Sequence, residues 1–208
     1  MYYLFLLLSL VSMVSPFNIC IAGISGRLGR ELAYQAITDK NLKVIGLSSS
    51  LYPIYKPFRG YGLEETQLTD MFKSDKLSID LYNNCNKYNY EHLIICTGAP
   101  SFMEDYSDIL TKNIIKNISP DCKSISLVTA KGTNKPTGDF YIELGKIFSL
   151  KDTYRAKKKQ EHIILNYKKK IHKFIYRPRL LSHGLSIFDS TTRYELAEKI
   201  LNNIENID

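Results

Sequence analysis

The residues of this sequence best suited to proton transfer are Tyr154 and Lys158, which stand four positions apart. On a helix, two residues at this spacing share one face. A tyrosine titrates near pH ~10, but a fixed ammonium beside it favours the phenolate. Thr129 offers a hydroxyl that would hold a substrate oxygen while Tyr154 gives or takes its proton. Because the chain has 15 Tyr and 28 Lys and Arg, the pair alone is better explained by a solvated basic helix, and the surrounding elements must decide.

The glycine segment 23–29, GISGRLG, is the second candidate site. It follows the apolar run Phe17–Ala22, which is long enough for one buried strand, and leads into apolar residues at helical spacing. A strand, a glycine turn and a helix N-terminus form a phosphate cradle, because glycine permits close approach and the helix N–H groups face the pyrophosphate. A plain turn between strand and helix is the alternative. The predicted dinucleotide contacts here are Gly23, Ser25, Gly26, Arg27, Leu28 and Gly29.

The end of the second predicted strand, Leu42–Leu47, indicates which dinucleotide would bind. An acid there would select NAD through the ribose 2′-hydroxyl. The sequence instead has Ser48 and Ser49, with Arg27 in the glycine segment. Hydroxyls and a guanidinium suit a 2′-phosphate, so NADP is the predicted cofactor and NAD the alternative. Serines that form a turn beside solvated basic residues would give the same pattern.

Further apolar runs complete an α/β pattern. Strands are expected at 77–81, 92–96 and 124–128, and the last of these delivers Thr129. Ligands of open α/β sheets lie across the carboxyl ends of the strands. Additional cofactor contacts are therefore predicted at Asp80, Thr97, Gly98 and Ala99. Near-continuous apolar strands fit a sheet covered on both faces, with Cys20 and Cys96 as core residues.

The expected fold class is α/β, a single doubly wound Rossmann domain spanning residues 17–208. Six or seven parallel strands in the order 3-2-1-4-5-6 are expected. A chain of 208 residues excludes a two-domain enzyme with a large separate substrate domain. Thr192 and Glu195 have the spacing of a capping box for the last helix. Four cysteines without a CxxC pair or metal spacing favour neither a disulfide scaffold nor a metal site.

The net charge of +7 is concentrated in residues 151–185, so an anionic partner is expected. A phosphate-bearing cofactor and an anionic membrane surface both fit. Nucleic acid is not expected, because no aromatic stacking platform or base-reading motif accompanies the charge. Residues 1–16 are apolar and uncharged, which fits a signal or anchor as well as an extra buried strand or helix. The secretory pathway or an organelle follows from a signal, and the cytoplasm otherwise.

From Phe17 to the C-terminus the sequence resembles the short-chain dehydrogenase/reductase superfamily, most closely its compact atypical or extended-like NAD(P)-binding members. The matching pieces occur in the family's order: GISGRLG at 23–29, TGAP at 97–100, LVTAKG at 127–132, YRAKKKQE at 154–161 and YRPRLLSHG at 176–184. Tyr154 follows Thr129 by 25 residues, the interval expected between the family's Ser/Thr and Tyr. Glu161 and the pair Arg177-Pro178 also stand where extended members place them.

The resemblance implies an NAD(P)-dependent oxidoreductase acting on a small carbonyl or hydroxyl substrate, as a monomer or homodimer. Thr129, Tyr154 and Lys158 would be catalytic, with Lys158 also on the nicotinamide ribose and Arg177 and Pro178 at the cofactor. Two alternatives stay open. One is a redox sensor or scaffold protein that binds the dinucleotide without turnover, and the other is an enzyme resembling nucleotide-sugar epimerases and dehydratases.

Overall fold

The computed structural model describes residues 17–51, 63–98, 105–134, 137–138, 142–143, 150–178, 181–182 and 191–207. The elements in chain order are β1 (Asn18–Ala22), α2 (Arg27–Thr38), β2 (Lys43–Ser48), α3 (Glu65–Lys73), β3 (Leu77–Leu81), η1 (Tyr82–Lys87), β4 (His92–Ile95), α4 (Ser107–Lys116), β5 (Ser124–Val128), α6 (Lys151–Leu165), β6 (His172–Tyr176), β7 (Leu181–Ser182), β8 (Thr191–Thr192) and α7 (Arg193–Glu205). The predicted signal or anchor, residues 1–16, lies outside the described residues, as does Ala99. None of the helices in the described ranges is long and apolar enough to span a bilayer.

Six strands form one parallel sheet in the order β3-β2-β1-β4-β5-β6, which confirms the predicted fold class and strand order. The direction of strand addition reverses between β1 and β4. In open α/β sheets, ligands bind outside the carboxyl ends of the strands at this switch point. A separate two-stranded pair, β7 with β8, precedes the last helix.

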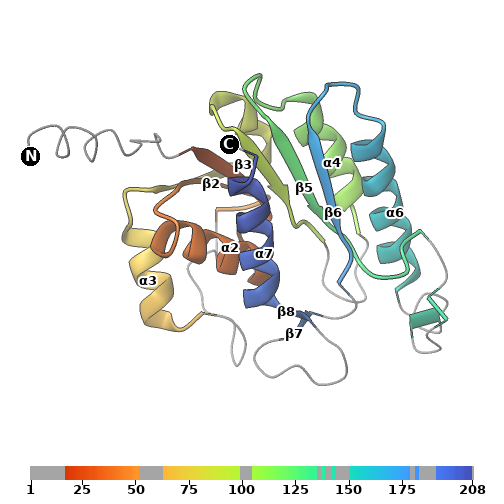
Figure 1. Ribbon diagram of the computed structural model, residues 1–208, viewed down its shortest axis with the longest axis horizontal. Coiled ribbons are helices and arrows are strands. Elements are labelled where there is room, and N and C mark those ends of the chain that lie inside the picture. The colour runs from red at the N-terminus through yellow and green to blue at the C-terminus, as the bar shows by residue number, and fades with distance from the viewer. Residues whose placement is uncertain are drawn as a thin grey trace, which may run out of the picture.

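Helices cover both faces of the sheet (Figure 1), so the central strands β1, β2, β4 and β5 are largely buried, whereas the edge strands β3 and β6 are partly exposed. One apolar cluster joins α2, α3 and α7 to the sheet, and it includes Ile21, Leu32 and Ile200. The other joins α4 and α6 to the opposite face, and it includes Leu93, Ile114 and Ile164. Every residue of β5 is buried, which explains its continuous apolar run. A strand that is packed on both faces has no solvent-facing side, so its polar and apolar residues do not alternate.

Cys20 and Cys96 both contribute to this interior. Cys20 is fully buried in the α4/α6 cluster, and Cys96 packs partly buried against the other cluster. Both are free thiols. Burial raises the pKa of Cys96 to about 12, so the thiol stays protonated at neutral pH and packs as a small apolar side chain.

The last helix supports the helix that follows the glycine segment. The predicted capping box is confirmed: Thr192 Oγ1 accepts from the Glu195 amide at 3.1 Å, and Glu195 Oε2 accepts from the Thr192 amide at 2.9 Å. Such a cap stabilises a helix by about 1 kcal/mol. Gln35 of α2 donates to the Tyr194 carbonyl at 3.2 Å, and Lys40 pairs with Glu205 at 2.7 Å. The C-terminal end of α2 and the residue Lys40 just after it are thus joined to both ends of α7.

Candidate active site

The glycine segment folds as a tight turn against the end of β4. Gly23 has a φ of +105°, which side-chain-bearing residues rarely adopt. A Cβ on Gly23 would lie 3.0 Å from the Cys96 carbonyl oxygen, and one on Gly29 would lie 2.1 Å from the Gly23 carbonyl oxygen. Glycine at both positions therefore allows α2 to begin directly behind the turn. This close packing places the α2 N-terminus at the switch point.

The start of α2 has the properties of an anion cradle. Its N-cap is Gly26, which has no side chain that could cap the amides of the first turn. These N–H groups lack partners within the helix, and their dipoles favour a negative charge. A pyrophosphate is the group that such a strand–turn–helix unit suits. Arg27, the first residue of α2, is exposed and stands at the same end.

The predicted contacts on β2 and β3 are engaged within the chain. Ser48 is buried, and its Oγ accepts from the Ser50 amide at 3.4 Å, whereas Ser49 is exposed. Asp80 accepts 2.7 Å hydrogen bonds from Asn84 and the Leu81 amide. These bonds, that to Asn84 above all, lower the pKa of Asp80. Asp80 thus anchors the corner between β3 and η1, and its contact with a dinucleotide stays a prediction.

The orientation of α6 about its axis buries Lys157 and leaves Lys158 exposed. The helix buries a stripe of five residues: Ala156, Lys157, Gln160, Glu161 and Ile164. Lys158 is exposed and lines a groove on the outer surface. Lys157 is 9% exposed, and its Nζ donates to the Thr97 carbonyl at the end of β4. Lys158 was predicted to contact the nicotinamide ribose, but it is Lys157 that reaches the end of β4, since packing of the stripe fixes the helix rotation. The contact of either lysine with a dinucleotide stays a prediction.

The side chain of Lys157 is almost completely shielded from solvent. A Cβ on Gly98 would lie 3.2 Å from Lys157 Nζ, so the absence of a side chain at Gly98 makes room for the amine. Burial lowers the pKa of Lys157, and the Asp105 carboxylate opposes that shift. Asp105 itself is 9% exposed and accepts from the Ser107 amide at 2.9 Å. The result is a desolvated amine at the carboxyl end of β4, whose charged form is disfavoured by burial.

Thr129 is held by a buried carboxylate that also binds Arg177. Thr129 Oγ1 donates to Glu161 Oε1 at 2.7 Å. Arg177 donates to the same carboxylate through Nε at 2.9 Å and Nη2 at 2.7 Å, and the Asn134 amide donates to it as well. This bonding raises the pKa of Arg177. The predicted cofactor contact Arg177 is thus directed at Glu161, because a buried carboxylate needs a paired charge.

Tyr154 lies at the loop that follows β5. Its hydroxyl donates to the Lys131 carbonyl at 3.2 Å. The Lys131 amide in turn donates to the Pro178 carbonyl at 2.8 Å, so Pro178 supports the loop on which the tyrosine rests. Tyr154 precedes Lys157 by three residues, a spacing that also places two side chains on one side of a helix.

Gln160 is a site residue that the sequence did not reveal. Its amide donates to Thr97 Oγ1 at 3.0 Å and to Thr111 Oγ1 at 2.7 Å. It thereby ties α6 to the end of β4 and to α4, one turn from Lys157. One feature of the sequence points to Gln160: it is polar, but it stands at helical spacing between Ala156 and Ile164, on the apolar side of the predicted helix. Elsewhere in the described part of the chain, His, Cys, Asp and Glu residues form no cluster suited to a metal ion.

Comparison with known proteins identifies the fold. No protein-family model matches the chain, and no curated protein matches its sequence at a significant level. Solved structures do match. A wide-type short-chain dehydrogenase/reductase from Veillonella parvula in complex with NADP superposes with a TM-score of 0.64 at 14% identity, covering 92% of this chain and 88% of that chain. The chain has the Rossmann fold of the short-chain dehydrogenases/reductases.

Two more structures show how widely this short-chain dehydrogenase/reductase fold is used. The anaerobillin reductase ChuY of Escherichia coli has a TM-score of 0.61 at 14% identity, covering 90% of each chain. UDP-glucuronic acid 4-epimerase of Bacillus cereus, in complex with NAD, has a TM-score of 0.54 at 12% identity, covering 78% of this chain and 58% of that chain. A reductase and an epimerase thus share the architecture. At these identities the likeness establishes the fold, and function has to be argued from the site.

The residues present fit a nicotinamide dinucleotide. The uncapped start of α2 would hold the pyrophosphate. The Lys157 amine beside Gly98 would meet ribose hydroxyls. The two positions are neighbours, because a Cβ on Gly23 would lie 3.0 Å from the Cys96 carbonyl oxygen, and Cys96 stands two residues before Gly98.

Proposed function

We propose that the chain is an NAD(P)-dependent oxidoreductase that acts on a small carbonyl or hydroxyl substrate at the carboxyl edge of the sheet. The observation that carries the proposal is the burial of the Lys157 ammonium beside Gly98, next to the uncapped N-terminus of α2. Burial of an amine is costly unless it is hydrogen-bonded or paired, and the Thr97 carbonyl is a partner of Lys157 within the chain. A dinucleotide lying across these strand ends would add its ribose hydroxyls as further partners.

The bound dinucleotide supplies or accepts the hydride. Tyr154, at the mouth of the site, would transfer the proton to or from the substrate oxygen. Lys157 would orient the ribose of the nicotinamide. The Thr129 hydroxyl donates to Glu161, so it offers acceptor lone pairs that suit the hydroxyl form of a substrate.

NADP is the proposed cofactor in preference to NAD. The end of β2 carries no carboxylate to bind a ribose 2′-hydroxyl, and Arg27 stands exposed at the start of α2. A guanidinium there suits a 2′-phosphate, which it can bind through two parallel hydrogen bonds. The compared structures contain NADP in one case and NAD in another, so the choice rests on these residues and not on the fold.

A dinucleotide-binding protein without turnover is the second candidate. It is favoured by the internal bonding of both candidate hydroxyls, Tyr154 to the Lys131 carbonyl and Thr129 to Glu161. A substrate would have to displace the first of these bonds. A pure binder would keep the glycine turn and Lys157 and would not need Tyr154 at the mouth of the site.

Fluorescence titration with NADPH and NADH, followed by a panel of aldehydes and ketones, tests the proposal. We expect tighter binding of NADPH and oxidation of it by at least one carbonyl compound. Binding without turnover across the panel would favour the second candidate. Absence of binding to both dinucleotides would overturn both.

A further inference from the structure

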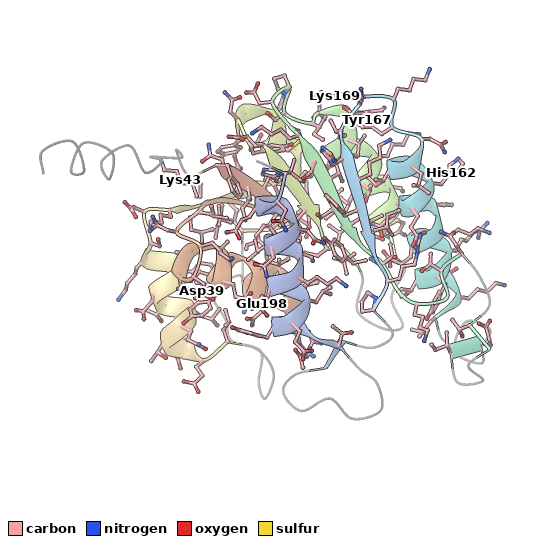
Figure 2. The ribbon with its side chains drawn as sticks, viewed as in Figure 1. Asp39, Lys43, His162, Tyr167, Lys169 and Glu198 are labelled. Atoms are coloured by element: carbon pink, nitrogen blue, oxygen red, sulfur yellow. The ribbon has the colours of Figure 1, made fainter. Side chains whose placement is uncertain are left out.

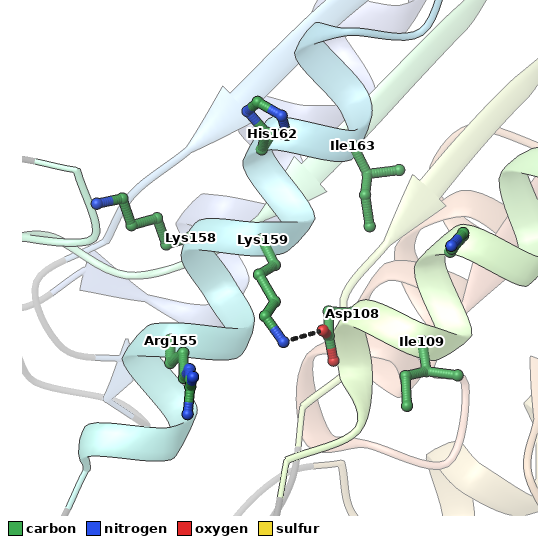
Figure 3. Close-up of a pocket in the computed structure, with 8 residues that line it drawn as sticks. Asp108, Ile109, Arg155, Lys158, Lys159, His162 and Ile163 are labelled. Carbon is green, nitrogen blue, oxygen red and sulfur yellow. Dashed lines mark ion pairs between the residues drawn. The ribbon is translucent and has the colours of Figure 1, made fainter.

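A groove of about 660 Å³ runs between α4 and α6 on the outer face of the molecule. Figure 3 shows its lining from both helices, including Ile109 from α4 and Arg155, Lys158, His162 and Ile163 from α6. None of these residues takes part in the proposed oxidoreductase site. The groove therefore calls for a separate explanation.

The charge of the groove is almost entirely positive. Asp108 is the one acid that lines it among the described residues, and Lys159 neutralises it in a 3.0 Å ion pair between the helices (Figure 3). Lys112, Arg155 and Lys158 also line the groove. No acid within the described ranges forms an ion pair with any of these three. The groove thus offers three uncompensated cations.

Apolar surface accompanies these cations. Ile109 is 53% exposed within the groove. A second hollow of about 250 Å³ continues past Ile109 and Arg155 to Tyr106, which is 57% exposed. The two hollows share a lining and follow the helix axes. The second hollow is also lined by Asp105 and Asp152, so the excess of positive charge belongs to the first hollow. A complementary ligand is therefore anionic where it lies over the first hollow and apolar where it meets Ile109 and Ile163.

Other occupants fit this surface less well. A symmetric pairing of two copies through this face would oppose like charges, which costs several kcal/mol across an interface. A membrane surface is broad and meets a projecting patch, whereas the cations here surround a hollow. Single-stranded nucleic acid needs successive aromatic platforms, and Tyr106 is the one aromatic among the described lining residues.

We propose that the groove between α4 and α6 docks an acidic amphipathic helix of another protein. Its aliphatic face would pack on Ile109 and Ile163, and its carboxylates would pair with Lys112, Arg155 and Lys158. Helices that lie in grooves are recognised in this manner, by apolar anchors at helical spacing with charges at the rim. This docking function is independent of the oxidoreductase chemistry.

The test uses a fluorescein-labelled peptide of about four helical turns with Leu along one face and Glu along the other. Fluorescence anisotropy is measured with the full chain at about 0.15 M salt. We expect a Kd on the order of 10 µM, weakened at least about tenfold by the double variant Lys112→Glu/Arg155→Glu. The matched control is Lys43→Glu/Lys73→Glu, which makes the same charge change at exposed residues of β2 and α3. Lys43 lies far from His162 in Figure 2.

The comparison arms make the result decisive. A peptide with Ser in place of Leu should bind less tightly, and one with Lys in place of Glu should bind only the double variant. No binding of the Leu/Glu peptide, or equal loss in the control variant, would overturn the proposal. It would also be overturned if phosphatidylserine vesicles or a single-stranded oligonucleotide bound in a groove-dependent way while the peptide did not.

Discussion

Lys157 and Gly98 approach each other so closely that a Cβ on the glycine would lie 3.2 Å from the lysine Nζ. The contact joins the buried face of α6 to the end of β4, and the adjoining Cys96 contacts the glycine turn at Gly23. The Lys157 amine and the N-terminus of α2 therefore lie at the same edge of the sheet. This relationship is the basis of the predictions that follow.

Replacing Lys157 with Met should weaken NADPH binding, whereas replacing Lys158 with Met should change it little. A hydrogen bond to a charged group contributes about 1.5–3 kcal/mol, or roughly 10- to 150-fold in Kd. The neighbouring lysine is a matched control because it differs in burial and not in chemistry. Fluorescence titration measures both, and a larger loss in Lys158→Met would contradict the assignment.

Gly26→Val should lower dinucleotide affinity while the fold survives. A Cβ at Gly26 would lie 3.2 Å from the Gly23 carbonyl oxygen. The turn must therefore shift, and its amide N–H groups would no longer point at the pyrophosphate. The extended backbone of Gly26 is open to valine. Gly29→Ala should instead destabilise the fold, because its Cβ would overlap that carbonyl. Urea unfolding and NADPH titration separate the two effects, and undiminished affinity in a folded Gly26→Val would place the site elsewhere.

Arg27→Ala should weaken NADPH more than NADH. Only NADPH carries the 2′-phosphate that the guanidinium would bind, a charge-assisted contact of about 1.5–3 kcal/mol. Competitive titration of the variant with both dinucleotides gives the ratio directly. An equal loss for the two would show that Arg27 does not read the 2′-phosphate, and tighter NADH binding by the wild type would reverse the proposed preference.

Tyr154→Phe should remove most turnover and leave dinucleotide binding nearly intact. A positioned general acid contributes a factor of roughly 10²–10⁴ in rate. The variant keeps the ring and deletes only the hydroxyl that donates to the Lys131 carbonyl. Steady-state kinetics with the best carbonyl substrate provides the measurement, and wild-type turnover would exclude Tyr154 as the proton donor.

The pH dependence of stability should report the burial of Lys157. Its folded pKa lies below the ordinary value of 10.5, so the unfolded chain binds more protons between those two values. The contribution of this group to the unfolding free energy therefore rises with pH through that window and is lost as pH falls below it. Urea unfolding of wild type and Lys157→Met should show a difference that grows in favour of the wild type up to about pH 10. A flat or falling difference would indicate a solvated ammonium.

The sequence was sufficient for the fold and for the glycine turn. Apolar runs of strand length, small residues at their ends and helical spacing after Gly29 are local signals. The sheet order was expected from the Rossmann fold class that these signals and the family resemblance indicated, and not from the runs themselves. The capping box of Thr192 and Glu195 was equally local. Each of these features depends on neighbours in the chain and not on tertiary packing.

The choice of lysine was not accessible in the same way. Lys157, Lys158 and Lys159 are consecutive, so a one-residue rotation of α6 exchanges the buried one. Packing of Ala156, Gln160 and Ile164 against the sheet and α4 decides that rotation. The bonding of Thr129 and Arg177 to Glu161 likewise joins β5, α6 and β6, which come together only in the folded chain.

A crystal structure of the chain with NADPH tests the central claim most directly. The account predicts the pyrophosphate on the amides at the start of α2, the ribose of the nicotinamide within hydrogen-bond reach of Lys157 Nζ, and Lys158 in solvent. A dinucleotide bound away from the glycine turn, or a ribose held by Lys158, would contradict it.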